Sequence, residues 1–288
     1  MNKYVIITDS GTDFTNEMAE QFDVKVIDLR VSVEGQEPIA NSNIDPKELY
    51  AMLRDKKNVS TSAVNFDDAK KAMEEHVKEG YDVLYLGFSS GLSSTFHSGK
   101  LAAEELSEEY PDRKVYAVDT LCASLGQGLL VYFAAMMRKN GADIDEVKAF
   151  VEQKRLNLCH WFTVDDLFFL KRGGRVSGAT AVVGTMLGIK PVMHVDNEGK
   201  LIKVSVARGR KSSIDALFDK MKESMTEDPK DATVFISHGD CYEDAKYLGD
   251  RVTEELGVKS VTIGYVGPVI GSHSGPGTLA LFYLGKGR

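Results

Sequence analysis

One stretch of the sequence decides the fold: Tyr85-Leu86-Gly87-Phe88-Ser89-Ser90-Gly91-Leu92-Ser93-Ser94-Thr95-Phe96-His97-Ser98-Gly99. The apolar residues 83–86 predict a buried strand, and residues 100–109 carry a helix pattern. A Ser/Gly turn between a strand and a helix gathers free N–H and O–H donors where the helix dipole is positive, which suits an anion. Capping of the helix explains one or two of the hydroxyl side chains. Five within seven residues favour an anion or carboxyl site over capping alone.

Outward from this stretch, strands and helices alternate. Apolar runs at residues 4–8, 24–33 and 114–118 predict further strands. This alternation favours a mostly parallel sheet that helices cover on both faces. Ligands of such sheets bind beyond the carboxyl ends of the strands. Hydroxyl-bearing turns are predicted at those ends, over residues 9–12, 60–62, 89–95 and 119–124.

The pattern changes after Asn157, where hairpins mix with helices. Residues 191–195 and 201–206 flank Asp196-Asn197-Glu198-Gly199, which predicts a hairpin. We therefore expect an α/β protein of two close-packed domains with a cleft between them. The predictions are a three-layer parallel-sheet domain (1–157), an α+β domain with a mixed sheet (158–288), and, within the latter, an apolar turn (167–170), a small-residue helix (177–188) and a Gly-rich loop (267–277).

Composition excludes several classes of function. The 288 residues carry a net charge of −8, whereas nucleic-acid binding needs clustered Lys and Arg. No apolar run approaches the roughly 20 residues of a membrane-spanning helix, and the N-terminal apolar run is too short for a signal peptide. Three scattered cysteines fit reduced thiols. These features predict a cytoplasmic protein with at most transient membrane contact.

A self-contained catalytic motif is missing from the sequence. Gly99-Lys100 is followed by Leu101, so it does not complete a phosphate-binding kinase loop. Gly91-Leu92-Ser93 begins a hydrolase elbow, but Thr95 stands where its second Gly belongs. The six histidines lack metal-ligand spacing on one helix, and no metal site is predicted. The pattern favours a carrier or binding protein, and a serine esterase that uses Ser93 is an alternative.

Two basic clusters and one histidine have a functional and a structural interpretation. The clusters are residues 171–175 and 208–211. Each is either solvated surface or a docking patch for an acidic partner or a phosphate. His273 lies between serines in a Gly-rich segment. A histidine in such a segment is structural unless the fold places it in the cleft.

Several motifs in this order resemble those of the DegV family, the fatty-acid-binding subunits of bacterial fatty acid kinase, often called FakB proteins. The resemblance covers essentially the whole chain. The motifs are Thr8-Asp9-Ser10, Ser60-Thr61-Ser62, Ser89-Ser90-Gly91-Leu92-Ser93, Leu170-Lys171-Arg172-Gly173-Gly174-Arg175, Lys190-Pro191 and Gly267-Pro268-Val269-Ile270-Gly271-Ser272-His273-Ser274-Gly275-Pro276-Gly277.

The resemblance implies a long-chain fatty acid in a buried tunnel near the domain junction, presented to an ATP-dependent FakA-type kinase that forms acyl-phosphate. It implies that Thr61 and Ser93 hold the carboxyl head, with His273 close by. Such a carrier is not catalytic alone and needs no cofactor of its own, since ATP and Mg²⁺ come through the kinase. Because similar folds serve dihydroxyacetone kinases, a carrier of a small, triose-like substrate is a further alternative. We predict carboxylate contacts from Thr61, Ser93, Ser62, Ser94 and His273, acyl-phosphate stabilisation by Arg172 and His273, and kinase docking through Arg208 and Arg210.

Overall fold

Strand β6 is the centre of the first half of the computed structural model, which describes residues 3–177 and 188–288. Every residue of β6 is buried. Val83 and Tyr85 share a core with residues of α3 and α4, whereas Leu84 and Leu86 share another with residues of α5 and α6. Successive side chains of a strand point to opposite faces, so an unbroken apolar run marks a strand covered on both sides.

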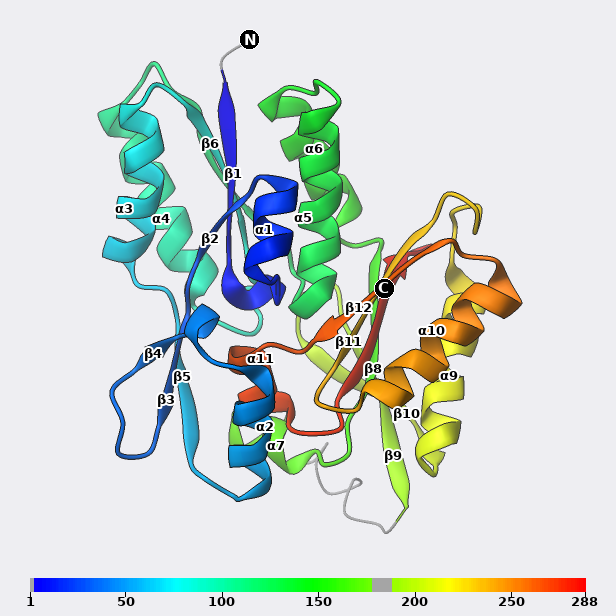
Figure 1. Ribbon diagram of the computed structural model, residues 1–288. Coiled ribbons are helices and arrows are strands. Elements are labelled where there is room, and N and C mark those ends of the chain that lie inside the picture. The colour runs from blue at the N-terminus through cyan, green and yellow to red at the C-terminus, as the bar shows by residue number, and fades with distance from the viewer. Residues whose placement is uncertain (1–2, 178–187) are drawn as a thin grey trace.

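Sheet A has the strand order β2-β1-β6-β7, and every pairing in it is parallel. Figure 1 shows α3 and α4 on one side of the sheet and α1, α5 and α6 on the other. The predicted three-layer arrangement is confirmed. The elements are β1 (Tyr4–Asp9), α1 (Asn16–Phe22), β2 (Lys25–Ile27), α3 (Phe66–Lys78), β6 (Asp82–Gly87), α4 (Thr95–Glu109), β7 (Val115–Asp119), α5 (Ser124–Lys139) and α6 (Ile144–Lys154).

A small antiparallel sheet, β4-β3-β5, was not predicted. Residues 24–33 were expected to form one strand, but they divide between β2 of sheet A and β3 of this second sheet. Where the chain leaves sheet A, the backbone N–H of Leu29 donates to Ser10 Oγ at 2.9 Å. Residues 60–62 were expected in a turn and instead belong to β5. The elements are β3 (Arg30–Val33), β4 (Ile39–Ala40), α2 (Pro46–Arg54) and β5 (Val59–Ser62).

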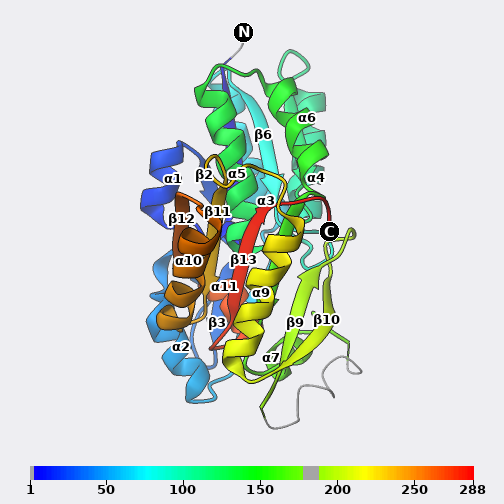
Figure 2. The same ribbon diagram turned by 90° about the vertical axis from the view of Figure 1, so that its right-hand side faces the viewer.

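Sheet C of the second half is mixed, as predicted, with the order β10-β9-β8-β13-β11-β12 and one parallel pair, β11 with β12. Helices α9 and α10 cover its outer face (Figure 2). On the inner face, Phe162, Phe235 and Phe282 share a core with Leu125 and Leu129 of α5. Helix α5 therefore packs between the two large sheets. The elements are β8 (Leu158–Thr163), β9 (Ile189–Val195), β10 (Leu201–Arg208), α9 (Arg210–Ser224), β11 (Thr233–His238), α10 (Tyr242–Leu256), β12 (Ser260–Tyr265) and β13 (Leu279–Leu284).

Helix α11 (Pro268–Ser274) stands where a Gly-rich loop was expected. Proline at the first turn suits a helix start, since its missing N–H would be unpaired there anyway. Val269 N donates to Asn41 Oδ1 at 2.9 Å, and Tyr50 Oη donates to the carbonyl of Val266 at 2.8 Å. These contacts hold α11 against the first half of the chain. Residues 167–170, expected to turn, begin the short helix α7 (Phe168–Arg172).

The structure does not test two of the predictions about the chain's organisation. The helix predicted over 177–188 falls largely outside the described residues. The domain boundary between residues 157 and 158 stays a prediction. In the described part of the chain, no helix combines the length and apolarity needed to cross a membrane.

Candidate functional site

A cavity of about 290 Å³ lies where segments of both halves meet. Its size is just below the range of about 300–1,000 Å³ that is usual for ligand pockets. The walls are mainly apolar, and Ser94, which is solvent exposed, lies at its opening. The apolar lining includes Leu29, Phe88, Leu92, Phe162, Leu170, Val266, Val269, Ile270 and Phe282, and the polar lining comprises Thr61, Ser93, Ser94, Ser124, His160, Arg175, Ser237, His273, Ser274 and Thr278.

The carboxylate of Asp9 positions the loop after β6 from beneath. Its Oδ2 accepts from the backbone N–H of Phe88 and from Tyr85 Oη, both at 2.8 Å, and its Oδ1 accepts from Gly11 N at 3.0 Å and Gln127 Nε2 at 3.3 Å. Burial raises the pKa of Asp9, and these hydrogen bonds oppose the shift. Asp9 was named only as part of a family motif, and its role here is structural.

The Ser93 hydroxyl accepts from the first turn of helix α4 and can also donate a hydrogen bond into the cavity. Its Oγ accepts from the backbone N–H of Thr95 at 3.2 Å and lies 2.9 Å from Thr95 Oγ1. Thr95 Oγ1 accepts from Val64 N at 3.3 Å, so its own proton can go to Ser93. In that arrangement Ser93 Oγ accepts twice, and its O–H is left to donate to a ligand. Helix capping therefore uses only the acceptor capacity of the Ser93 hydroxyl and leaves its O–H donor available.

Thr61 of β5 meets His273 of α11, and both line the cavity. Thr61 Oγ1 lies 2.8 Å from His273 Nε2. Burial, with the charges of Arg175 and Arg172, lowers the pKa of His273 to about 4. The imidazole is therefore neutral at neutral pH. In its Nε2–H tautomer it donates to Thr61, and the threonine hydroxyl is then free to donate to a ligand.

Arg175 supplies a cation that the sequence interpretation did not assign to the cavity. After α7, Gly174 adopts a left-handed conformation with φ of 73°, and Arg175 N donates to the carbonyl of Leu170 at 2.9 Å. The guanidinium then points back: Nε donates to the carbonyl of Leu92 at 3.2 Å and Nη1 to that of Gly173. Burial lowers the pKa of Arg175. The two glycines before Arg175 were the available signal for this turn.

The predicted contacts divide into those at the cavity and those away from it. Thr61, Ser93, Ser94 and His273 line it, but Ser62 is exposed and does not. Neighbouring residues of a strand face opposite sides, so β5 cannot turn Thr61 and Ser62 to the same cavity. The side chain of Arg172 is also exposed and lies over the Phe169 ring, 5.2 Å from its centroid. The role predicted for Arg172 stays a prediction.

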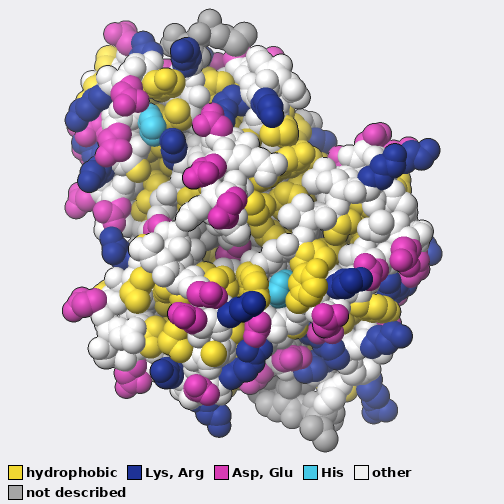
Figure 3. All heavy atoms as spheres, in the orientation of Figure 1, with side chains coloured by type: hydrophobic (Ala, Val, Ile, Leu, Met, Phe, Trp, Pro, Cys, Tyr) yellow, Lys and Arg dark blue, Asp and Glu magenta, His cyan; other side chains and the backbone are white. Residues whose placement is uncertain are grey.

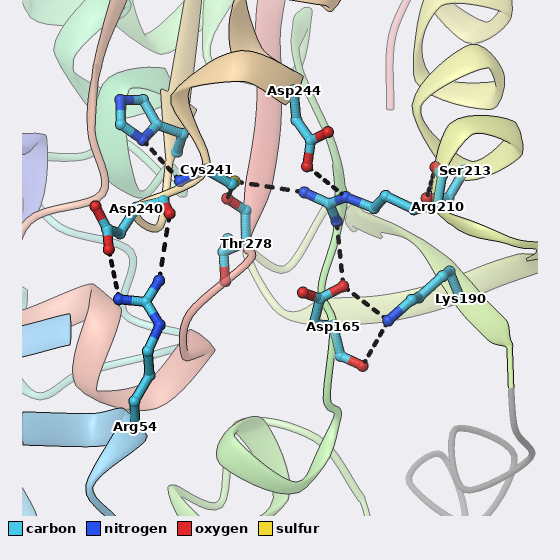
Figure 4. A network of polar contacts seen from close by, with 10 residues as sticks. Arg54, Asp165, Lys190, Arg210, Ser213, Asp240, Cys241, Asp244 and Thr278 are labelled. Carbon is cyan, nitrogen blue, oxygen red and sulfur yellow. Dashed lines mark hydrogen bonds and ion pairs between the residues drawn. The ribbon is translucent and has the colours of Figure 1, made fainter. Parts of the chain in front are cut away.

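The two arginines predicted to dock a partner differ in their surroundings. Arg208 is exposed at the end of β10. Arg210 is half-buried, and its Nε donates to Asp244 at 2.8 Å while Nη1 lies 3.7 Å from Asp165 (Figure 4). Lys190 Nζ contacts the same Asp165 oxygen at 2.7 Å. Arg210 is therefore held within an ion-pair network. These ion pairs account for an arginine at this position without any role in docking a partner protein.

A second polar group lies in the cavity wall. Ser124 Oγ is 2.5 Å from Asp13 Oδ2 and 3.0 Å from Ser237 Oγ. Both serines line the cavity, and all three residues are buried. Burial raises the pKa of Asp13 to about 7, against the effect of its hydrogen bonds. Ser124 belongs to the hydroxyl-bearing turn predicted over residues 119–124, but its grouping with Asp13 and Ser237 was not predicted, because Ser237 lies 113 residues further along the chain and no motif joins them.

Charged residues of both signs mix on the molecular surface seen in Figure 3. Lys and Arg alternate there with Asp and Glu, and no single-sign field dominates this face. A broad nucleic-acid footprint would need such a field. This view agrees with the net charge of −8.

Comparison with known proteins gives one consistent result. Residues 3–286 match the family model described as "Uncharacterised protein, DegV family". A DegV domain-containing protein of Clostridium perfringens is 46% identical over 99% of this chain and 98% of its own. A fatty-acid-binding DegV family protein of Thermus thermophilus is 30% identical, with a TM-score of 0.88 over 99% of this chain and 100% of its own. A hypothetical protein of Thermotoga maritima, described as revealing a fatty acid binding function, is 31% identical, with a TM-score of 0.85 and the same coverage. The chain belongs to the DegV family.

Proposed function

We propose that the protein binds a long-chain fatty acid in this cavity. The observation that carries the proposal is one cavity with mainly apolar walls whose lining includes the donors Thr61, Ser93 and Arg175, with Arg175 bonded to the carbonyl of Leu92 next to Ser93. A carboxylate accepts from hydroxyl and guanidinium groups, and an acyl chain matches the apolar walls. The fatty-acid-binding descriptions of the Thermus and Thermotoga relatives support this choice of ligand.

The energetics suit such a ligand. Burial of a methylene contributes about 0.8 kcal/mol, so a sixteen-carbon chain offers roughly 11 kcal/mol before the costs of association. The carboxylate must keep its hydrogen bonds, because a buried unpaired charge costs far more than a buried neutral group. Two hydroxyls and one guanidinium meet this need with a single full positive charge.

We further propose that the carboxylate is presented to a FakA-type kinase, which brings ATP and Mg²⁺. A carboxylate oxygen attacks the γ-phosphorus, the bond to the β-phosphate oxygen breaks, and the products are acyl-phosphate and ADP. Hydroxyl donors leave the attacking oxygen nucleophilic. Arg208 is exposed and available to a partner, and Ser94 marks the opening through which the head is reached.

The two alternatives fit the geometry less well. An esterase needs a base within hydrogen-bond reach of its nucleophile. The hydroxyl next to Ser93 belongs to Thr95, whereas His273 Nε2 is bonded to Thr61. A triose carrier needs a site that is polar throughout, but Phe162, Leu170 and Phe282 line this one.

Solvent extraction of the denatured, purified protein followed by mass spectrometry tests the binding of fatty acid. We expect a long-chain acid in the extract, or its uptake when it is added. Thr61→Ala and Ser93→Ala should each weaken binding about tenfold or more, because each removes a hydrogen bond to a charged group. The exposed Ser62→Ala is the matched control and should bind like the wild type. An empty extract together with no uptake would overturn the proposal.

The kinase step needs its own measurement. A purified FakA-type kinase with ATP and Mg²⁺ should convert the loaded protein's ligand to acyl-phosphate, seen as ADP release that depends on both proteins. Loaded protein that supports no ADP release with any such kinase would refute this step and leave the binding proposal intact.

A further inference from the structure

The buried serine pair Ser124–Ser237 forms a second polar position in the wall of the cavity. Ser124 begins α5 and Ser237 belongs to β11, so the two halves of the chain each contribute one hydroxyl. Ser237 is fully buried, and Ser124 is 6% exposed. The opening lies beside Ser94, on a different segment. A ligand whose carboxylate is at Thr61 and Ser93 therefore extends into a cavity that is not uniformly apolar.

We propose that this pair binds a hydroxyl group carried on the acyl chain, so that the preferred ligand is a hydroxylated long-chain fatty acid. The inference rests on the fatty-acid-binding function proposed above and names the substrate class within it.

The direction of the hydrogen bonds supports a hydroxyl over other substituents. When Asp13 is ionised, Ser124 must donate to it and Ser237 donates to Ser124, which leaves Ser237 Oγ as an acceptor. When Asp13 is protonated, the chain can reverse, and Ser237 then donates into the cavity. A hydroxyl both donates and accepts, so it pairs with Ser237 in either state. A ketone only accepts and pairs in one state alone.

Hydrogen bonding to Asp13 does not by itself need Ser237. The bond from Ser124 already satisfies Oδ2 of the buried Asp13 carboxylate within the first half of the chain. Beside an unsubstituted acyl chain, a lone pair of Ser237 Oγ stays unused when Asp13 is ionised, and its O–H has no acceptor when the chain of hydrogen bonds reverses. A partner on the ligand removes that deficit, and an unpaired buried polar group is the costlier arrangement.

The test measures dissociation constants of the full-length protein for hexadecanoic acid and for hexadecanoic acids hydroxylated at successive positions. One position, or two adjacent ones, should bind about tenfold more tightly than the others, because only there is the buried hydroxyl paired. Ser237→Ala and Ser124→Ala should each reduce this ratio between isomers to about one. Ser213→Ala, a buried serine whose Oγ donates to the carbonyl of Arg210, is the matched control and should keep the wild-type ratio.

The outcomes separate this inference from the function on which it rests. If no isomer is preferred although hexadecanoic acid binds, the second polar position does not recognise a hydroxyl and the inference is wrong. A preference that persists in both serine variants would equally overturn it. Failure to bind any of these acids would instead refute fatty acid binding itself. Thermal unfolding of each variant shows that the ratios come from folded protein.

Discussion

Arg175 and Arg172 lie three residues apart in the same turn, yet we expect their substitution by glutamine to have different effects. Arg175 lines the cavity and is half-buried, whereas Arg172 is exposed and stacks on a phenylalanine ring. A hydrogen bond between a charged donor and a carboxylate contributes about 1.5–3 kcal/mol. At 1.4 kcal/mol for each factor of ten, Arg175→Gln should weaken fatty acid binding roughly 10- to 150-fold. An exposed ion pair contributes about 0–1 kcal/mol, so Arg172→Gln should weaken it at most about fivefold.

Titration calorimetry with hexadecanoic acid and hexadecanol measures these differences. The alcohol has the same chain without the charge, so Arg175→Gln should leave its affinity within about threefold of the wild type. Because Arg175 also donates to the carbonyls of Leu92 and Gly173, thermal unfolding must accompany each titration. Equal losses for the acid in both variants would refute the assignment of Arg175. Equal losses for acid and alcohol in Arg175→Gln would show that the side chain shapes the cavity and does not pair with the carboxylate.

Three further predictions concern stability and partner docking. The pKa of His273 is about 4 in the folded protein and about 6.5 in the unfolded chain, so its contribution to stability is complete above pH 6.5 and falls by up to about 3 kcal/mol as the pH drops to 4. The difference in unfolding free energy between the wild type and His273→Gln should therefore shrink over this pH range. A difference that stays constant would contradict this prediction. Tyr50→Phe leaves the carbonyl of Val266 without its donor and should lower the unfolding free energy by about 1–3 kcal/mol in urea titrations, whereas an unchanged midpoint would mean that water replaces the hydroxyl. Arg208→Glu should reduce kinase-coupled ADP release without loss of stability. Arg210→Glu should instead lower the melting temperature, because it places a carboxylate beside those of Asp165 and Asp244. If Arg208→Glu lowered the melting temperature and Arg210→Glu reduced only ADP release, the docking role would belong to Arg210.

The layers of the fold could be predicted from the sequence because they depend on local periodicity. The apolar run through Leu84 and Tyr85 marks a strand buried on both faces, whatever its distant neighbours are. Helix α11 could not be predicted in this way, since its Gly and Ser residues have weak helix propensity. Packing against Tyr50 and the hydrogen bond from Val269 to Asn41 supply what the local sequence lacks.

Site residues could be predicted where their chemical type alone identifies them, but not where their position depends on the backbone conformation. The hydroxyls of Ser93 and Ser94 follow a strand and reach the cavity from there. Assigning Ser62 to the cavity failed because residues 60–62 were interpreted as a turn; a strand would have separated it from Thr61 by alternation alone. The sequence interpretation chose Arg172, whereas Arg175 lines the cavity; placing Arg175 there requires the left-handed Gly174, which no charge pattern reveals.

The charge balance around the carboxylate links the geometry to the function proposed above. Two cations at the head would neutralise the carboxylate and weaken it as a nucleophile, whereas two neutral hydroxyls alone would leave its charge buried without a counterion. The described cavity lining offers an intermediate: Arg175 carries a charge, and His273, which lines the same cavity, is kept neutral by its burial and by the charges of Arg175 and Arg172, which lower its pKa. The contacts of α11 with Asn41 and Tyr50 hold His273 in place before a ligand arrives, so little ordering entropy is lost on binding. A preorganised site with one counter-charge can therefore retain a fatty acid and still leave one carboxylate oxygen reactive.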